Sequence, residues 1–243
     1  MGGAAAVSFD AVVFDLYGTL VDEFPRALFF ETLEAMADAL GAPREAFRAD
    51  WEKTAIARQT GAYATVEDNV LAICDAMGGP VRDDGLSRAM ALRAEMYDRS
   101  FRPKPAALET LRAIRERGLP IALVSMCAPD TPALWRATEL AAFIDVEVFS
   151  SEVGLRKPDP AIYEAACDGL GVAAASCLYV GDGAYGELSG AAAIGMMAVL
   201  VRDPGEAPGE MLRPESEDTW DGHVIASLAE VDPMLDDVQA VEG

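Results

Sequence analysis

Basic residues are scarce in this sequence of 243 residues. Lysine and arginine number 19 together, against 41 aspartates and glutamates, which gives a formal net charge of −22 at pH 7. This acidic excess disfavours nucleic acid or an anionic membrane as a partner, because both would repel the protein. An anionic small molecule would need local positive charge or a metal ion to be held. The only lysines are Lys53, Lys104 and Lys157, so a lysine inside a motif is informative.

Paired cysteines and long apolar runs are also missing. The four cysteines lie far apart and form no C-x-x-C pair, which is typical of reduced thiols. The first fifteen residues carry no basic region ahead of their short apolar run, so we expect no signal peptide. No apolar run approaches the roughly 20 residues of a membrane-spanning helix. We therefore expect a cytoplasmic protein.

Short apolar runs recur along the chain instead. They cover residues 11–15, 120–125, 146–150, 177–182, 196–201 and, more weakly, 223–228. Runs of this length that are apolar throughout predict strands buried on both faces of a parallel sheet. Amphipathic helical patterns lie between them. The sequence therefore predicts an α/β fold with a doubly wound, Rossmann-like parallel sheet, whose functional residues lie at the carboxyl ends of the strands.

Residues 23–98 break this alternation. They contain helical patterns, such as Phe29, Leu33, Met36 and Leu40 at helical spacing, and no convincing strand. A helical insertion directly after the first strand predicts a small cap domain over the strand ends. We therefore expect an α/β core formed by residues 1–22 and 99–243, and a helical cap formed by residues 23–98.

Polar residues gather where the predicted strands end. The segments that carry them are FDLYGTLVD (14–22), LVS (123–125), GLRKPDPAIY (154–163) and YVGDGAYGELSGAAAIGM (179–196). The residues are Asp15, Thr19, Ser125, Lys157, Asp182 and Glu187. Because the carboxyl ends of parallel strands meet at one edge of a sheet, we expect these side chains to converge.

In their order and spacing, these segments resemble the motifs of the haloacid dehalogenase-like hydrolase superfamily, in its form with an inserted helical cap. The resemblance covers essentially the whole chain. It implies Asp15 as nucleophile, Ser125 as a ligand of a phosphate oxygen, and Lys157 as the cation that steadies nucleophile and phosphoryl group. In the phosphatase branch it implies that Asp182 binds Mg²⁺, together with Asp15 and the backbone carbonyl of Tyr17.

The chemistry of the residues suits this reaction. A carboxylate that attacks phosphorus gives an aspartyl-phosphate, which water then hydrolyses. The negative charge that gathers must be offset, and Mg²⁺ and Lys157 would do so. Carboxylates converging on one site repel one another unless a cation is present, and Mg²⁺ prefers hard oxygen ligands. The predicted Mg²⁺ ligands are Asp15, Tyr17, Asp182 and Glu187.

Two positions depart from the family pattern. Glu187 stands where the family usually has Asp; it is one methylene longer and would bind the metal directly or through water. Tyr17 stands where phosphatases have the Asp that protonates the leaving alkoxide and then activates water, a contribution of roughly 10²–10⁴ in rate. Tyrosine, with an unperturbed pKa of about 10, is a poor substitute. Asp22 and Glu23, at the start of the cap, are the nearest alternative acids.

The candidate residues fall into two further groups. The candidate catalytic residues are Asp15, Tyr17 and Lys157. The candidate phosphate- or substrate-binding residues are Thr19, Ser125, Arg26 and Arg58, the two arginines because an anionic substrate needs a cation in the cap.

A phosphatase acting on a small phosphate monoester, such as a sugar phosphate or phosphorylated biosynthetic intermediate, fits these residues best. Three alternatives stay open. The D-x-Y-G-T first motif is typical of 2-haloacid dehalogenases, whose halide leaves without a proton and which use no metal. The segment GDGAYG (181–186) also matches the G-x-G-x-x-G of dinucleotide-binding folds, with Asp203 about 20 residues on. The third alternative is a non-catalytic binding protein of the same family.

Overall fold

A parallel sheet forms the centre of the protein. The computed structural model describes residues 8–78, 81–82, 84–206, 209–212 and 219–237. Its six strands have the order β3-β2-β1-β4-β5-β6. They are β1 (Ala11–Phe14), β2 (Ile121–Ser125), β3 (Val146–Phe149), β4 (Cys177–Gly181), β5 (Met197–Val201) and β6 (His223–Ile225). Each lies inside one of the predicted apolar runs, and all neighbours are parallel, which confirms the predicted α/β fold.

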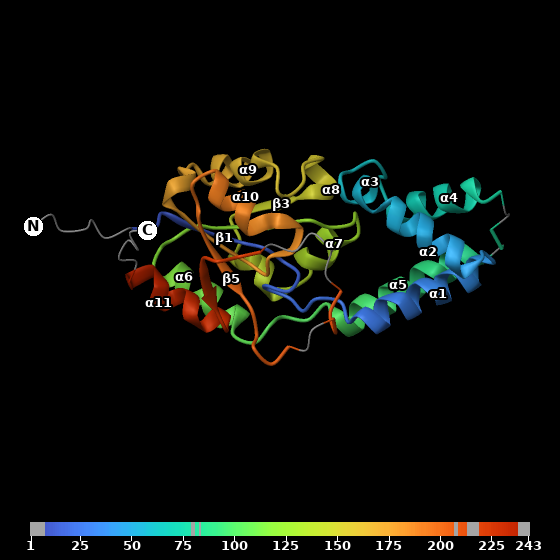
Figure 1. The fold of residues 1–243 in the computed structure, drawn as a ribbon, viewed down its shortest axis with the longest axis horizontal. Coiled ribbons are helices and arrows are strands. Elements are labelled where there is room, and N and C mark those ends of the chain that lie inside the picture. Colours follow the sequence, from blue (N-terminus) through green and yellow to red (C-terminus); the bar gives the residue numbers. More distant parts are fainter. Residues whose placement is uncertain (1–7, 79–80, 83, 207–208, 213–218, 238–243) are drawn as a thin grey trace, which may run out of the picture.

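Helices cover both faces of this sheet (Figure 1). The α-helices beside it are α6 (Ala107–Glu116), α7 (Thr131–Arg136), α8 (Ser150–Val153), α9 (Pro160–Leu170), α10 (Glu187–Ala193) and α11 (Val231–Asp237). Short 3₁₀ helices cover Glu139–Phe143, Ala174–Ser176, Ala184–Gly186 and Leu228–Glu230. Val12 and Phe14 pack in the apolar cluster that includes α6, whereas Ala11 and Val13 pack in the cluster that includes α9 and α10. The alternation of side chains along a strand thus explains why β1 is apolar throughout.

A separate group of helices follows β1 before the chain returns to β2. It comprises α1 (Arg26–Leu40), α2 (Arg44–Lys53), α3 (Ala55–Gln59), α4 (Val66–Ala76) and α5 (Gly85–Ser100). These helices lie to one side of the sheet, with α1 packed along α5 (Figure 1). They bury an apolar cluster of their own, which includes Met36, Phe47 and Val70. The described part of the region expected to form the cap therefore contains helices and no strand. No described helix of the protein is long and apolar enough to span a bilayer.

The segment that leads from the sheet into α1 is paired with a distant loop. Leu212 N donates to Phe24 O at 2.8 Å, and Arg26 N donates to Glu210 O at 2.9 Å. Glu210 and Leu212 belong to the loop between β5 and β6. Two backbone hydrogen bonds therefore fix the point at which the helical region leaves the sheet.

Phe14 offers a direct test of the sheet core. Its side chain is 0% exposed in the central strand β1. Phe14→Ala removes most of an aromatic side chain from a close-packed cluster, so we expect the free energy of unfolding to fall by about 3–5 kcal/mol in urea denaturation. Val224→Ala, on edge strand β6 at 57% exposure, is the matched control and should change it by less than about 0.5 kcal/mol. If both variants lost the same free energy of unfolding, this placement of the core would be contradicted.

Candidate active site

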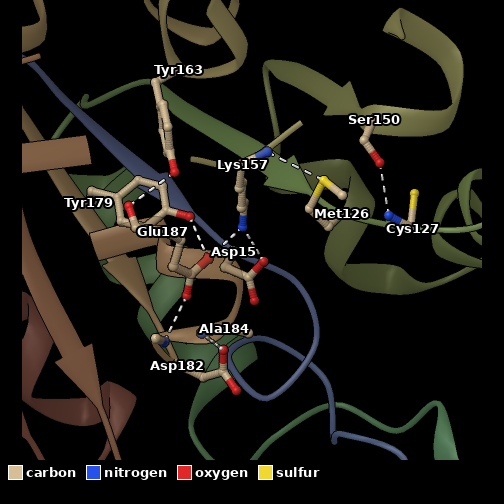
Figure 2. A network of polar contacts seen from close by, with 11 residues as sticks. Asp15, Met126, Cys127, Ser150, Lys157, Tyr163, Tyr179, Asp182, Ala184 and Glu187 are labelled. Atoms are coloured by element: carbon tan, nitrogen blue, oxygen red, sulfur yellow. Dashed lines mark hydrogen bonds and ion pairs between the residues drawn. The ribbon is translucent and has the colours of Figure 1, made fainter. Parts of the chain in front are cut away.

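Predicted site residues meet at the carboxyl ends of the central strands, and Figure 2 shows four of them, Asp15, Lys157, Asp182 and Glu187. Asp15 directly follows β1, Ser125 ends β2, Asp182 directly follows β4, and Glu187 begins α10. Lys157 comes from the loop between α8 and α9. All of these side chains are buried.

One ammonium group joins two of the carboxylates. Lys157 Nζ lies 2.5 Å from Asp15 Oδ1 and 2.5 Å from Glu187 Oε2, and Figure 2 shows its side chain reaching between them. Burial lowers the pKa of the Lys157 ammonium, but the two carboxylates outweigh burial and hold that pKa above its ordinary value. Lys157 is therefore charged at neutral pH and fixes the position of Asp15.

Glu187 is held by several donors of its own. Its Oε2 also accepts from the Tyr179 hydroxyl at 2.7 Å, and its Oε1 accepts from Gly183 N at 2.9 Å. The Tyr163 hydroxyl donates to its backbone carbonyl at 3.0 Å. Burial raises the pKa of Glu187 to about 7; Asp15 adds to the rise and Lys157 opposes it. Both carboxylate oxygens of Glu187 therefore have protein donors, and one of these donors is Lys157.

Asp182 faces the turn that follows β1. Its Oδ1 accepts from Ala184 N at 3.0 Å, and its Oδ2 lies only 2.5 Å from the place that a Cβ on Gly18 would occupy. Gly18 has φ +73°, so this turn needs glycine both for its conformation and for the approach of Asp182. The amides of Gly183 and Ala184 donate to carboxylates of the site, to Glu187 and Asp182. Because these two amides already donate to carboxylates of the protein, the segment gives no support to the dinucleotide-binding alternative.

The arrangement of Asp15, Asp182 and Glu187 fits a metal ion. Each offers one carboxylate oxygen, and these oxygens all lie within 4.8 Å of one another. Burial raises the pKa of Asp15, Lys157 lowers it and Asp182 raises it again, which leaves it above its ordinary value. A divalent cation would relieve that repulsion, and an all-oxygen donor set is the kind that Mg²⁺ prefers. A contribution from the Tyr17 carbonyl stays a prediction.

Two buried hydroxyls belong to the same strand-end loops. Thr19 and Ser125 are 0% exposed, and neither Thr19 Oγ1 nor Ser125 Oγ hydrogen-bonds a nitrogen or oxygen atom of the described chain. The Cys127 thiol is a neighbour of Ser125. A buried hydroxyl without a good partner is costly. These hydroxyls are therefore suited to complete their bonding with oxygen atoms of a ligand.

Tyr17 lies in the wall of the site. Its hydroxyl hydrogen-bonds Thr131 Oγ1 at 2.8 Å, and its ring centroid lies 5.1 Å from that of Phe24 and 5.8 Å from that of Phe101. Burial, with Tyr97 adding to it, raises the pKa of Tyr17 well above its ordinary value. The Tyr17 phenol is thus a still weaker acid than free tyrosine. Its raised pKa gives no support to a role as the missing proton donor.

A cavity of about 830 Å³ lies between the strand ends and the helical region. Asp15 and Tyr17 line it from the sheet side. Arg26 and Arg58, the two arginines predicted to bind substrate, both line it as well. Arg26 is exposed, whereas Arg58 is only 6% exposed. Trp51 belongs both to the helical core and to this lining.

Three further lining residues were missed by sequence analysis: Arg93, Tyr97 and Tyr185. Arg93 Nε lies 2.5 Å from Asp130 Oδ2, and the Tyr97 hydroxyl donates to Asp130 Oδ1 at 3.1 Å. The Tyr185 hydroxyl accepts from Gln59 Nε2 at 2.9 Å and so joins the loop after β4 to α3. The backbone of Tyr185 has φ +57°, which is uncommon for a residue with a side chain. No local pattern separates Arg93 from an ordinary solvated arginine of a helix.

Removal of the Lys157 charge should destabilise the fold in a pH-dependent way. Lys157→Met would leave Asp15 and Glu187 buried together without their cation. We expect a loss of about 3–5 kcal/mol in the free energy of unfolding near neutral pH with a chelator present. Lys157 lowers the pKa of both carboxyl groups, so in the folded variant each keeps its proton to a higher pH than in the native protein, and the difference in stability between the two proteins grows as pH rises. The loss should therefore shrink near pH 5.

Urea denaturation at the two pH values measures this difference. Lys53→Met removes a charge from an exposed lysine of α2 and is the control; its effect should stay within about 0.5 kcal/mol at both. A loss in Lys157→Met that is the same at both pH values would contradict the buried pairing of Lys157 with two carboxylates.

Known proteins resemble this chain in sequence and in fold. The family profile described as haloacid dehalogenase-like hydrolase matches residues 9–195. Curated relatives include (S)-2-haloacid dehalogenase 4A of Burkholderia cepacia, 26% identical over 94% of this chain and 95% of that protein. Phosphoserine phosphatase of Thermus thermophilus is 30% identical over 84% of each chain. A crystal structure of an HAD phosphatase from Thermococcus onnurineus has a TM-score of 0.64 and 22% identity, covering 93% of this chain and 97% of that one. The chain belongs to the haloacid dehalogenase-like hydrolases.

Proposed function

We propose that this hydrolase is a Mg²⁺-dependent phosphatase, which cleaves a small phosphate monoester through an aspartyl-phosphate on Asp15. The observation that carries the proposal is the convergence of Asp15, Asp182 and Glu187 within 4.8 Å. A nucleophile and one lysine would suffice to displace a halide. The additional buried carboxylate of Asp182 is best explained by a metal ion that helps to bind a phosphoryl group.

Each step of this reaction has a residue of the chain to perform it. Asp15 attacks phosphorus, the bond from phosphorus to the leaving oxygen breaks, and water later hydrolyses the aspartyl-phosphate to release phosphate. Lys157 holds Asp15 and offsets the charge that gathers on the phosphoryl oxygens. Thr19 and Ser125 would donate their hydroxyl protons to those oxygens. Mg²⁺, held by Asp15 and Asp182 with Tyr17 O and Glu187 as further predicted ligands, would supply additional positive charge there.

We assign the missing acid to Glu23. Glu23 is 8% exposed and lines the same cavity as Asp15, and its Oε1 accepts from Phe24 N at 2.9 Å. Asp22, the other acid considered from the sequence, is not part of that lining, and its backbone N–H donates to Arg102 O. Glu23 is therefore the carboxyl better placed to protonate a leaving alkoxide and then to accept a proton from water.

Tyr17 favours one second candidate, a 2-haloacid dehalogenase. In that reaction Asp15 attacks carbon, an ester forms, halide leaves with the bonding electrons, and water hydrolyses the ester. Because halide needs no proton, the reaction needs no acid at position 17. The rings of Tyr17 and Phe24 supply an apolar wall beside Asp15 for such a substrate.

The setting proposed for either activity is the cytoplasm. The four cysteines are free thiols and all are buried, as suits a reducing compartment. We propose a small-molecule substrate, and neither a nucleic acid nor a membrane as partner, because the net charge of −22 repels both.

Product release decides between the two activities. Phosphate release from a panel of phosphate monoesters with Mg²⁺ should be lost when a chelator replaces the metal. It should fall on the order of 10³-fold or more in Asp15→Asn, which lacks the nucleophile. A dehalogenase would instead release halide from 2-chloropropionate, unaffected by the chelator and lost in the same variant. Undiminished turnover of Asp15→Asn in both assays would remove Asp15 as nucleophile.

Glu23→Gln should separate the two halves of the phosphatase reaction. An alkyl phosphate needs a proton on its leaving oxygen, so its turnover should fall by roughly 10²–10⁴. p-Nitrophenolate leaves unprotonated, so p-nitrophenyl phosphate should still give a rapid burst of one nitrophenolate per site before slow hydrolysis of the aspartyl-phosphate. Rapid-quench measurement detects that burst. Asp22→Asn is the control and should behave as the native protein does; a reversal of the two phenotypes would move the acid to Asp22.

A further inference from the structure

One buried arginine in the cavity wall forms no ion pair with any residue that the structure describes. Arg58, in α3, is 6% exposed, and its Cζ lies 3.8 Å from the ring centroid of Trp51. Its hydrogen bonds all use Nη1 and go to neutral acceptors, which are Trp51 O at 3.1 Å, Asn69 Oδ1 at 2.7 Å and Thr54 Oγ1 at 3.3 Å. None of the ion pairs within the described residues includes Arg58. A buried guanidinium without a carboxylate is unusual and costly.

A second arginine of the cavity wall, Arg93, is paired with the nearby carboxylate of Asp130. Arg93 Nε and Nη2 bind the two carboxylate oxygens of Asp130 at 2.5 and 3.1 Å. Arg93 also lies over Trp51, with its Cζ 5.3 Å from the ring centroid. Burial, and after it the charge of Arg93, lower the pKa of Arg58 to about 10. Of these two neighbouring buried guanidinium groups, Arg93 is paired with Asp130 and Arg58 is left without a carboxylate within the described residues, in a protein whose net charge is −22.

Hydrogen-bonding groups around Arg58 are also left unsatisfied. Trp51 Nε1 and Asn69 Nδ2 are buried and have no hydrogen-bond partner. Arg58 Nε and Nη2 make no hydrogen bond within the described chain. Trp51 and Arg58 both line the cavity, whereas Asn69 holds Arg58 in place through its Oδ1. The Nε–Nη2 edge of a guanidinium is a planar fork that matches the two oxygens of a carboxylate.

The rest of the lining is strongly aromatic. Besides Tyr17 and Trp51 it includes Phe24, Phe29, Phe30, Tyr97 and Tyr185. At about 830 Å³ the cavity has room for far more than a phosphate on a short chain. Apolar walls of this kind suit a hydrophobic group of the ligand.

We propose that Arg58 and Trp51 form a second anion-binding subsite, and that the substrate carries a carboxylate joined through an apolar, flat body to the group that reacts at Asp15. Asn69 is the positioning residue of this subsite. The identity of the reacting group as a phosphate rests on the proposed function; the carboxylate and the apolar body rest on the cavity alone. The phosphatase assigned above thus acts on a phosphorylated apolar acid rather than on a small sugar phosphate.

Isothermal titration calorimetry with 2-naphthoate tests the subsite without any phosphate. We expect 2-naphthoate to bind the native protein at least about tenfold more tightly than the neutral 2-naphthalenemethanol, as charge-assisted hydrogen bonds predict. Arg58→Gln and Arg58→Met should each abolish this preference, and Arg58→Lys should keep part of it. Thermal unfolding establishes that each variant is folded. If 2-naphthoate does not bind, or binds all variants equally, the proposal is overturned.

Arg48→Gln is the matched control. Arg48 Cζ also lies 3.8 Å from a lining ring, that of Phe30. Arg48 differs in being exposed and in having a carboxylate of its own, Glu52, 3.0 Å away. Its replacement should leave the affinity for 2-naphthoate within about twofold of the native value. An Arg48→Gln variant that loses the preference as fully as Arg58→Gln does would overturn the assignment to Arg58.

A second titration separates this proposal from the phosphatase assignment. In Asp15→Asn protein, 6-carboxy-2-naphthyl phosphate should bind at least about tenfold more tightly than 2-naphthyl phosphate, and Arg58→Gln should remove the difference. If neither phosphate binds but 2-naphthoate still depends on Arg58, the phosphatase assignment fails and the subsite stands. If both phosphates bind equally with Arg58 present, the subsite fails and the phosphatase assignment stands.

Discussion

The candidate active site depends on the two ion pairs that the Lys157 ammonium group forms with buried carboxylates. The parallel neighbours β1 and β4 end side by side and place Asp15 and Asp182 together, and α10 adds Glu187 to the same pocket. Carboxylates gathered out of water would repel one another, and Lys157 bonds to two of them at 2.5 Å each. Tyr163 and Tyr179 hold Glu187 from the opposite side. Asp15, the proposed nucleophile, is thus fixed in place by a charge that comes from a different loop.

The distribution of charge across the cavity follows from the same constraint. Under the proposed function, an anion has to approach the acidic groups of the sheet edge in a protein whose net charge is −22. Lys157 supplies positive charge at the sheet edge, and Arg58 supplies it in the helical wall, where Arg58 and Arg93 both lie over Trp51. The buried cations beside the cavity, rather than the net charge, would let this acidic protein accept the anionic substrate that we propose.

The sheet and the centre of the site could be predicted from the sequence because both depend on short-range patterns. Apolar runs identify buried strands, and the carboxyl ends of parallel strands meet at one edge, so Asp15, Lys157 and Asp182 converge as expected. Most of the cavity wall could not be predicted in this way, although Arg26 and Arg58 were expected there and do line the cavity. Helical periodicity does not say which arginine faces the cavity, and Arg93 is placed by Asp130, a residue beyond β2. The bond from Tyr17 to Thr131 likewise joins segments 114 positions apart.

The pairing of the α1 entry with the loop after β5 has a mechanical consequence. Phe24 and Arg26 are bonded through their backbones to Leu212 and Glu210, and Leu212 also lines the cavity. The start of the helical region is therefore tied to this loop by two backbone hydrogen bonds. The two bonded loop residues lie farther along the chain than every predicted site residue. The position of the helices beside the cavity thus depends in part on a stretch of sequence that carries none of the predicted chemistry.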